Sequence, residues 1–198
     1  MSSRDSLIFQ VLRPLVLFGV RINPVLRQLN AQSHERILDA GCGYGYLVKY
    51  LSHCQYTGID LEPQRIEWAK LKFGENTNRR FMQADACRTN LPPKSFDKAV
   101  AFGLLHHLPD EAASQCIREL TRLVRKKIVF LDGVYSKFNF VNNLLCKFDQ
   151  GKYVRQAADY VSLVTPHVAK VEKTFYHAYS GVAKYFMMTC ELDPASAQ

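Results

Sequence analysis

The sequence predicts an α/β fold built on a doubly wound, mostly parallel seven-stranded sheet, with N-terminal helices and a C-terminal antiparallel hairpin. Between residues 36 and 133, short apolar runs alternate with segments of helical period, which is the pattern of parallel strands joined by helical crossovers. A glycine-rich turn follows the first apolar run. Two strand-like runs separated by a short turn close the sequence and indicate a hairpin. The 198 residues suffice for one such domain.

The N-terminal segment 1–33 is predicted to form two short helices that cover the domain or act as a lid. Its apolar runs, at 7–9 and 15–18, are separated by Arg13 and Pro14, so neither reaches the roughly 20 residues that a transmembrane helix needs. No small-residue cleavage site follows them, which argues against a signal peptide. Contact of these helices with a membrane surface is an alternative.

The elements of the core follow from apolar runs and helix-start signals. Ile37 begins a buried strand, and the glycine turn after it leads into a helix-compatible run over 47–53. Pro63 and Asp110 mark the starts of two helices, and the apolar spacing of the second extends to Val124. The other strands are expected over 55–59, 79–84, 98–102 and 128–131, and the hairpin over 168–177 and 182–190.

Charge and cysteine content restrict the function. A net charge of +8 and a pI near 9.2 would suit nucleic acid or an anionic membrane. The densest basic run, Arg122–Lys127, however falls at a helix end and a strand start, opposite the carboxyl ends of the strands, where it offsets the helix dipole. Six cysteines without a Cys-x-x-Cys pair indicate neither a zinc site nor a disulfide framework, so a reducing, cytoplasmic location is expected.

The glycine turn indicates the kind of ligand. Gly41, Gly43 and Gly45 stand at alternate positions, where the absence of a Cβ lets a ligand lie against the main chain. A dinucleotide turn would need its third glycine at Tyr46, and Asp39 before the turn suits a cation better than a phosphate. The sequence pattern Asp-x-Gly-x-Gly-x-Gly resembles the first motif of class I S-adenosylmethionine-dependent methyltransferases. These enzymes have a Rossmann-like fold and a cofactor that carries a sulfonium.

Two further carboxylates extend this resemblance. Asp60 lies nineteen positions after Gly41, where it suits the two ribose hydroxyls; a helix N-cap is its alternative role, and Glu62 is a weaker candidate. In this family the residue that corresponds to Asp85, within Gln-Ala-Asp-Ala, accepts the adenine amino group. The residues that the resemblance assigns to S-adenosylmethionine binding are Asp39, Gly41, Cys42, Gly43, Tyr44, Gly45, Asp60, Leu61, Asp85, Ala86 and Phe102.

The region after the fourth strand suggests the acceptor class. Ser95–Val100 followed by Gly103–Leu108 resembles the same region of small-molecule and quinone-type methyltransferases. It has neither the Asn/Asp-Pro-Pro-aromatic signature of base-amine methylation nor a Pro-Cys nucleophile, so nucleic acid is not the expected substrate. His106 and His107 are candidate catalytic bases, with loop packing as an equal alternative. No third ligand accompanies them, so no metal is expected.

The insertion after the fifth strand holds candidate substrate residues. Segment 149–155 is similar to an Asp-x-Gly-x-x-x-Arg stretch of related small-molecule enzymes, which makes Tyr153 and Arg155 candidates. Pinning of the insertion to the domain is their alternative role. Tyr135 follows the fifth strand and is a third candidate, and Asp132 borders the same space.

The resemblance implies a single domain over residues 1–198. Its expected parts are an N-terminal cover or lid (1–33), a cofactor-binding core (34–133), a substrate-side insertion (134–166) and a C-terminal hairpin (167–192). Its expected reaction transfers a methyl group from S-adenosylmethionine to an oxygen, nitrogen or carbon of a small molecule and leaves S-adenosylhomocysteine. An RNA-modifying enzyme and a catalytically silent protein that binds the same ligand are the alternatives. The oligomeric state is not predicted.

Overall fold

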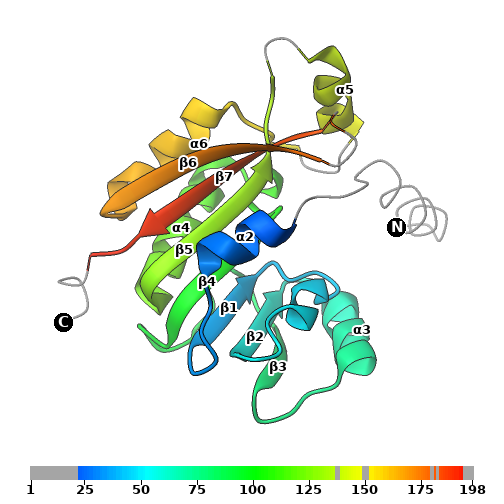
Figure 1. Cartoon of the computed structure of the whole chain (residues 1–198), viewed down its shortest axis with the longest axis vertical. Helices are drawn as coiled ribbons and strands as arrows, with labels where there is room; N and C mark the ends of the chain where they lie inside the picture. Colours follow the sequence, from blue (N-terminus) through cyan, green and yellow to red (C-terminus); the bar gives the residue numbers. More distant parts are fainter. Residues whose placement is uncertain (1–21, 137–138, 149–151, 179–180, 182, 194–198) are drawn as a thin grey trace.

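The computed structural model describes residues 22–136, 139–148, 152–178, 181 and 183–193. Their strands form one seven-stranded sheet in the order β3-β2-β1-β4-β5-β7-β6. Strands β1 to β5 are parallel, and β7 runs antiparallel to both β5 and β6 (Figure 1). The predicted fold class is therefore confirmed. The strands are β1 (Arg36–Ala40), β2 (Gln55–Asp60), β3 (Arg79–Gln83), β4 (Phe96–Phe102), β5 (Val124–Gly133), β6 (Lys170–His177) and β7 (Lys184–Glu191).

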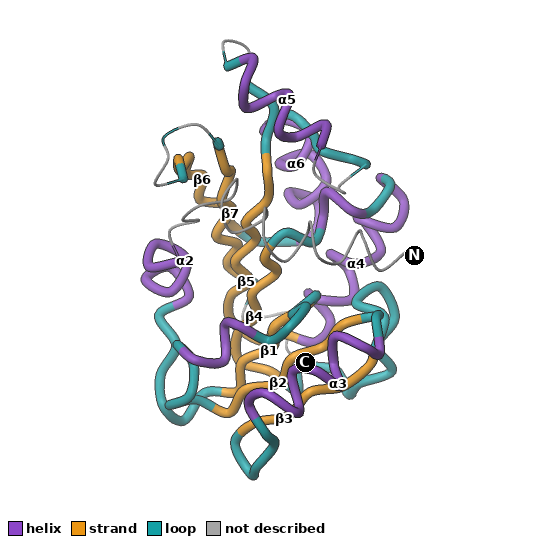
Figure 2. Tube along the Cα trace, turned by 90° about the vertical axis from the view of Figure 1, so that its right-hand side faces the viewer, coloured by secondary structure: helices purple, strands orange, loops and turns teal. Residues whose placement is uncertain are grey.

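Helices cover both faces of the sheet, as Figure 2 shows from the side. The α-helices within the described residues are α2 (Ile22–Leu29), α3 (Pro63–Phe73), α4 (Asp110–Leu123), α5 (Phe140–Phe148) and α6 (Ala157–Val164). Helices α4 and α6 pack on one face, and α2, α3 and the segment after the glycine turn pack on the other. Successive strand residues, such as Val129 and Phe130, enter opposite layers because side chains alternate along a strand.

The segment after the glycine turn is a correction to the predicted helix over 47–53. It forms only a 3₁₀ turn, η1 (Tyr46–Lys49), followed by irregular turns up to β2. The chain must return along the full length of β2, which is about 20 Å for six residues. If the nine residues 46–54 formed an α-helix, they would span only about 14 Å. The connection from the glycine turn to β2 is therefore more extended than an α-helix.

Two other predicted features differ in detail. Helix α4 ends at Leu123, and Val124 already begins β5, because the β4–β5 pairing starts at Phe96 and Val124. Asp110 is the first helical residue rather than the cap, and its carboxylate pairs with Arg155. The hairpin matches the expected ranges closely, although β6 begins at Lys170 and β7 at Lys184.

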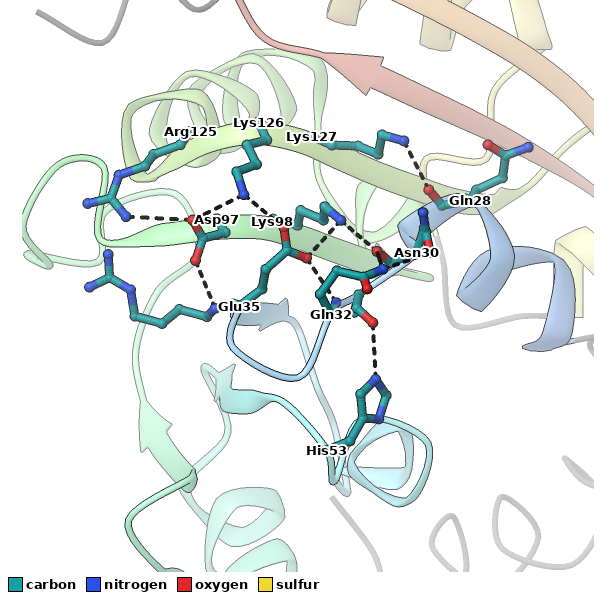
Figure 3. A network of polar contacts seen from close by, with 12 residues as sticks. Gln28, Asn30, Gln32, Glu35, His53, Asp97, Lys98, Arg125, Lys126 and Lys127 are labelled. Atoms are coloured by element: carbon teal, nitrogen blue, oxygen red, sulfur yellow. Dashed lines mark hydrogen bonds and ion pairs between the residues drawn. The ribbon is translucent and has the colours of Figure 1, made fainter.

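The basic run Arg122–Lys127 lies at the amino-end edge of the sheet and is engaged with acidic partners there (Figure 3). Lys126 Nζ lies 2.9 Å from a Glu35 carboxylate oxygen, and the buried Lys98 lies 2.8 Å from the other oxygen. Asp97 accepts a 2.9 Å hydrogen bond from the backbone N–H of Arg36. This network ties the loop before β1 to β4 and β5, so the run is a structural element.

None of the described helices is long and apolar enough to cross a membrane. Of the predicted N-terminal cover or lid, only α2 and the loop after it belong to the described residues, and residues 1–21 lie outside them. Helix α2 buries Val25 and Leu29 against the sheet, so this part is a cover. The six cysteines form no disulfide, and the described residues hold no cluster of potential metal ligands.

We predict that Glu35→Gln lowers the free energy of unfolding near pH 7 by about 3 kcal/mol, because the buried Lys98 ammonium loses its charged partner. Burial alone would raise the pKa of Glu35, but hydrogen bonds from Lys98, Lys126 and the backbone of Gln32 lower it from 4.5 to about 2. The contribution is therefore complete above pH 4.5 and is lost as the pH falls towards 2. Urea unfolding between these pH values measures it.

Lys126→Gln is the matched control, because this side chain is half-exposed and its pair with Glu35 is screened by water. It should cost less than about 1 kcal/mol. Equal losses in the two variants, or an unchanged acid profile in Glu35→Gln, would contradict the role of the buried carboxylate.

Candidate functional site

The glycine turn is fixed to the tip of β2 by two hydrogen bonds. The backbone N–H of Cys42 donates to the Ile59 carbonyl at 2.8 Å, and the N–H of Gly43 donates to Asp60 Oδ2, also at 2.8 Å. The turn therefore lies at the carboxyl ends of β1 and β2. This is the edge where open parallel sheets bind ligands.

The glycines of the turn have different roles. A Cβ at Gly45, where φ is +70°, would lie 2.7 Å from the Phe81 ring and 3.1 Å from Ala69, so this glycine allows close packing. At Gly43, where φ is +54°, a Cβ would meet nothing within 4 Å. The main chain at Gly43 thus faces open space in a left-handed conformation that favours glycine. A ligand can approach the backbone here.

Asp60 borders the open backbone of Gly43 from the β2 side. We call Gly43 together with the carboxylates of Asp39 and Asp60 the cradle. Its carboxylate is almost completely buried and accepts hydrogen bonds from the N–H groups of Gly43 and Glu62, at 2.8 and 3.0 Å. The Arg65 guanidinium lies 3.6 Å from Oδ1. A carboxylate has about four acceptor positions, so capacity for a ligand hydroxyl is left. The side chain both shapes the turn and offers negative charge to a ligand.

Asp39 lies under the turn in a buried pair with Tyr56. The Tyr56 hydroxyl donates a 2.6 Å hydrogen bond to Oδ2, while the buried Oδ1 has no hydrogen-bond partner among the described residues. Burial raises the pKa of Asp39 from 3.8 to about 7; the bond from Tyr56 opposes this rise, and the charge of Asp60 adds to it. Asp39 is thus a carboxylate whose ionisation a cationic ligand would favour.

The other residues predicted to bind the cofactor lie at or just after the carboxyl ends of β1, β2, β3 and β4. Leu61 directly follows Asp60 and is 62% exposed, an unusual state for an apolar side chain beside a buried site. Asp85 is exposed, and its Oδ1 accepts a 2.8 Å hydrogen bond from the Cys87 N–H, which fixes the loop after β3. Ala86 is buried, and Tyr44 and Phe102 are half-buried.

A histidine–aspartate pair stands at the ends of β4 and β5. His106, in the turn η2 (Leu105–His107), places Nδ1 2.7 Å from Asp132 Oδ1, and both side chains are buried. The backbone N–H of His106 donates to the same oxygen at 3.1 Å. The carboxylate therefore favours the tautomer with the proton on Nδ1 and makes Nε2 the basic nitrogen. The exposed His107 ring stacks on His106, with ring centroids 4.2 Å apart.

The contacts of Arg155 match the alternative role expected for it, which is to pin the insertion to the domain. All five N–H groups of its buried guanidinium are engaged, with the Asp110 carboxylate and the carbonyls of Leu105, Leu108 and Tyr153. The residue therefore pins the insertion to η2 and has no donor left for a substrate. Tyr153 is partly exposed, and its backbone N–H donates to the His106 carbonyl at 2.9 Å, so it stays beside the histidine pair.

The structure also brings in residues that the sequence did not single out. Tyr56 would be taken for an ordinary core residue of a strand, and only the fold places its hydroxyl on Asp39. Asp132 was noted as a neighbour of the site but not as the partner of His106. No local pattern could have revealed either contact, because the partners lie on different strands and turns.

The cradle fits a positively charged nucleoside ligand. Open backbone at Gly43, the Asp60 carboxylate, the unpartnered Oδ1 of Asp39 and the exposed Leu61 supply a contact surface, negative charge and an apolar face. The two larger surface hollows, of about 850 and 640 Å³, lie elsewhere, beside the end of α4 and beside α2. The chemistry of the side chains therefore identifies this cradle.

Residues 37–127 match the model of a family described as a methyltransferase domain. An uncharacterized methyltransferase of Anoxybacillus flavithermus is 30% identical over 139 residues, which cover 68% of this chain and 64% of the relative. A ubiquinone biosynthesis O-methyltransferase of Vibrio cholerae is 29% identical over 110 residues, 54% of this chain and 44% of that protein. The chain spans less than two thirds of the length of these relatives.

Solved structures share the fold. Magnesium protoporphyrin IX methyltransferase from Synechocystis with bound SAH has a TM-score of 0.71 at 18% identity, over 90% of this chain and 84% of that one. The YcgJ protein of Bacillus subtilis has a TM-score of 0.71 at 15% identity, over 86% of this chain and 97% of that one. At these identities the likeness concerns the fold alone.

We predict that Asp39→Asn removes a pH dependence of stability between pH 4 and 7. Because the folded protein holds the Asp39 proton up to about pH 7, the wild type loses stability as the pH rises from 3.8 through 7. That change in pKa corresponds to a loss of at most about 4 kcal/mol in the free energy of unfolding. Chemical denaturation of both proteins across this range measures the difference.

Tyr56→Phe should extend the loss of stability to higher pH, because it removes the hydrogen bond that lowers the pKa of Asp39. Parallel profiles of wild type and Asp39→Asn between pH 4 and 7 would show that Asp39 is not the titrating group.

Proposed function

We propose that this chain, whose residues 37–127 match a methyltransferase domain family, is a class I S-adenosylmethionine-dependent methyltransferase that transfers a methyl group from this donor to a small-molecule acceptor. The observation that carries the proposal is the open glycine backbone at Gly43, which is hydrogen-bonded to the buried Asp60 carboxylate in the turn that follows the buried Asp39. This arrangement suits a sulfonium nucleoside with an amino acid tail. It suits a pyrophosphate poorly, because both flanking groups are acidic.

The donor is held by the residues of the cradle. Asp60 would accept from the ribose hydroxyls, and Leu61 would pack against the adenine. Asp85 would accept from the adenine amino group. Asp39 would favour the cationic end of the donor as it ionises. When bound, S-adenosylmethionine supplies an electrophilic methyl group.

The protein contributes alignment, exclusion of water and removal of one proton. Asp132 holds His106 in one tautomer, so that Nε2 accepts the proton of an attacking hydroxyl. Arg155 fixes the backbone of η2 and thereby the position of the imidazole. An oxygen acceptor fits this arrangement best, because a hydroxyl needs a base, and similar proteins include O-methyltransferases of ubiquinone biosynthesis.

Two alternatives are less well supported. RNA would need a basic surface near the cradle, but the densest basic run is paired with Glu35, Asp97 and Glu119 at the opposite edge. A catalytically silent binding protein would not need the His106–Asp132 pair. Six cysteines that form no disulfide fit a reducing compartment such as the cytoplasm.

The deciding experiment is incubation of the protein with radiolabelled S-adenosylmethionine and fractionated host extract. Label in a small-molecule fraction supports the proposal. Label in RNA supports the RNA-modifying alternative, and binding of the donor without label in any fraction supports the silent protein.

We predict that Asp60→Asn weakens binding of S-adenosylhomocysteine by about 10- to 100-fold, because a charged acceptor for the ribose is replaced by a neutral amide. Isothermal titration calorimetry measures this directly. Because Asp60 also holds the Gly43 N–H, a thermal unfolding curve must show that the variant is folded.

Glu62→Gln is the control, since this neighbouring carboxylate is exposed and should change the affinity by less than about twofold. An Asp60→Asn variant that is folded and binds as tightly as the wild type would refute the ribose assignment.

We predict that Asp132→Asn lowers kcat by about 10²- to 10⁴-fold with the acceptor that the labelling experiment identifies, while the affinity for the donor is unchanged. The amide oxygen still accepts from the backbone N–H and Nδ1 of His106, but it carries no negative charge, so the imidazolium that forms when Nε2 takes a proton loses its charged partner. His106→Gln should have a similar kcat.

The His107→Gln variant separates the two histidines, because the hydrogen bond to Asp132 involves Nδ1 of His106 and the His107 side chain is exposed. It should retain most of the activity. Near-normal kcat in Asp132→Asn would mean that the pair only supports the loop.

A further inference from the structure

Helix α5 exposes three apolar side chains while it buries an asparagine. Asn142 is buried, with 1% of its surface exposed, whereas Phe140, Val141 and Leu144 are 79, 54 and 41% exposed. The three apolar residues are spaced i, i+1 and i+4, so they share one face of the helix. A helix that only completes the fold would show the reverse arrangement.

The buried side of α5 is held by asparagine hydrogen bonds. Asn142 Nδ2 donates to the Val134 carbonyl at 2.9 Å, and its Oδ1 accepts from the Lys184 N–H at 2.7 Å. Asn143 exchanges two 2.8 Å hydrogen bonds with the backbone of Ser136. The helix is therefore fixed to the ends of β5 and β7 without using its exposed apolar side chains. That face is left available for another surface.

The surroundings of this face are basic. Segment 137–152, which includes α5, contains three lysines and one aspartate, and the whole chain carries a net charge of +8. Lys152 is exposed after the helix. Exposed apolar side chains in a segment of basic composition match the two components of an anionic lipid surface, an acyl boundary and negative headgroups. A helix of nine residues is too short to span a bilayer and suits the interface.

We propose that α5 docks the protein onto the surface of an anionic lipid bilayer, inserting Phe140, Val141 and Leu144 into the headgroup boundary. Figure 1 shows α5 beyond the carboxyl end of β5, and in Figure 2 it projects away from the body of the sheet. The contact would therefore bring the carboxyl-end edge, with His106 and the cradle, to the bilayer. Docking itself does not depend on methyl transfer.

Co-sedimentation of the full chain with vesicles tests the proposal. The protein should bind phosphatidylcholine vesicles that contain phosphatidylglycerol, bind pure phosphatidylcholine more weakly, and lose affinity as salt is raised. The double variant Phe140→Ser, Leu144→Ser should bind the anionic vesicles at least about tenfold more weakly. It should retain the wild-type affinity for S-adenosylhomocysteine.

Leu71→Ser is the matched control, because Leu71 on α3 is 87% exposed and far along the chain from α5. This variant should bind vesicles like the wild type. Equal vesicle binding by the double variant, or failure of the wild type to bind anionic vesicles, overturns the proposal. So does a wild-type dimer in light scattering that the double variant abolishes, since a second copy would then occupy the face.

Discussion

The hydrogen bond from the Gly43 N–H to the Asp60 carboxylate is the contact on which the site depends. It joins the loop after β1 to the tip of β2 and holds the turn in a left-handed conformation that leaves the backbone open. The parallel register of the two strands, which pairs Ala40 with Ile59, brings the partners together. One buried carboxylate therefore shapes the ligand surface and supplies charge to it.

Charge is divided between the two edges of the sheet. At the amino-end edge the basic run meets Glu35 and Asp97, so much of its positive charge is neutralised within the fold. At the carboxyl-end edge Asp39 and Asp60 lie together, and their proximity helps to raise the pKa of Asp39. A strongly basic protein thus presents an acidic cradle. The overall net charge describes the ligand site poorly because the fold decides which charges meet.

The insertion after β5 extends this local organisation to the turn that carries His106. Arg155 reaches back to the carbonyls of Leu105 and Leu108, and so fixes the turn that carries His106. Asn142 ties α5 to the ends of β5 and β7. Both residues replace apolar packing with directed hydrogen bonds. This gives a defined position to elements that lie outside the main hydrophobic layers.

The sequence by itself determined the strands, the glycine turn and the position of Asp60 at a strand end, because these follow from neighbouring residues and from the alternation of parallel strands. Local spacing was misleading for 47–53, where the distance back along β2 outweighed helical periodicity, and for Val124, which begins β5 instead of ending α4. Only the tertiary structure paired Tyr56 with Asp39 and Asp132 with His106, and occupied every donor of Arg155. These contacts join residues on different elements, and hydrogen bonds form between side chains only where packing brings them within about 3 Å.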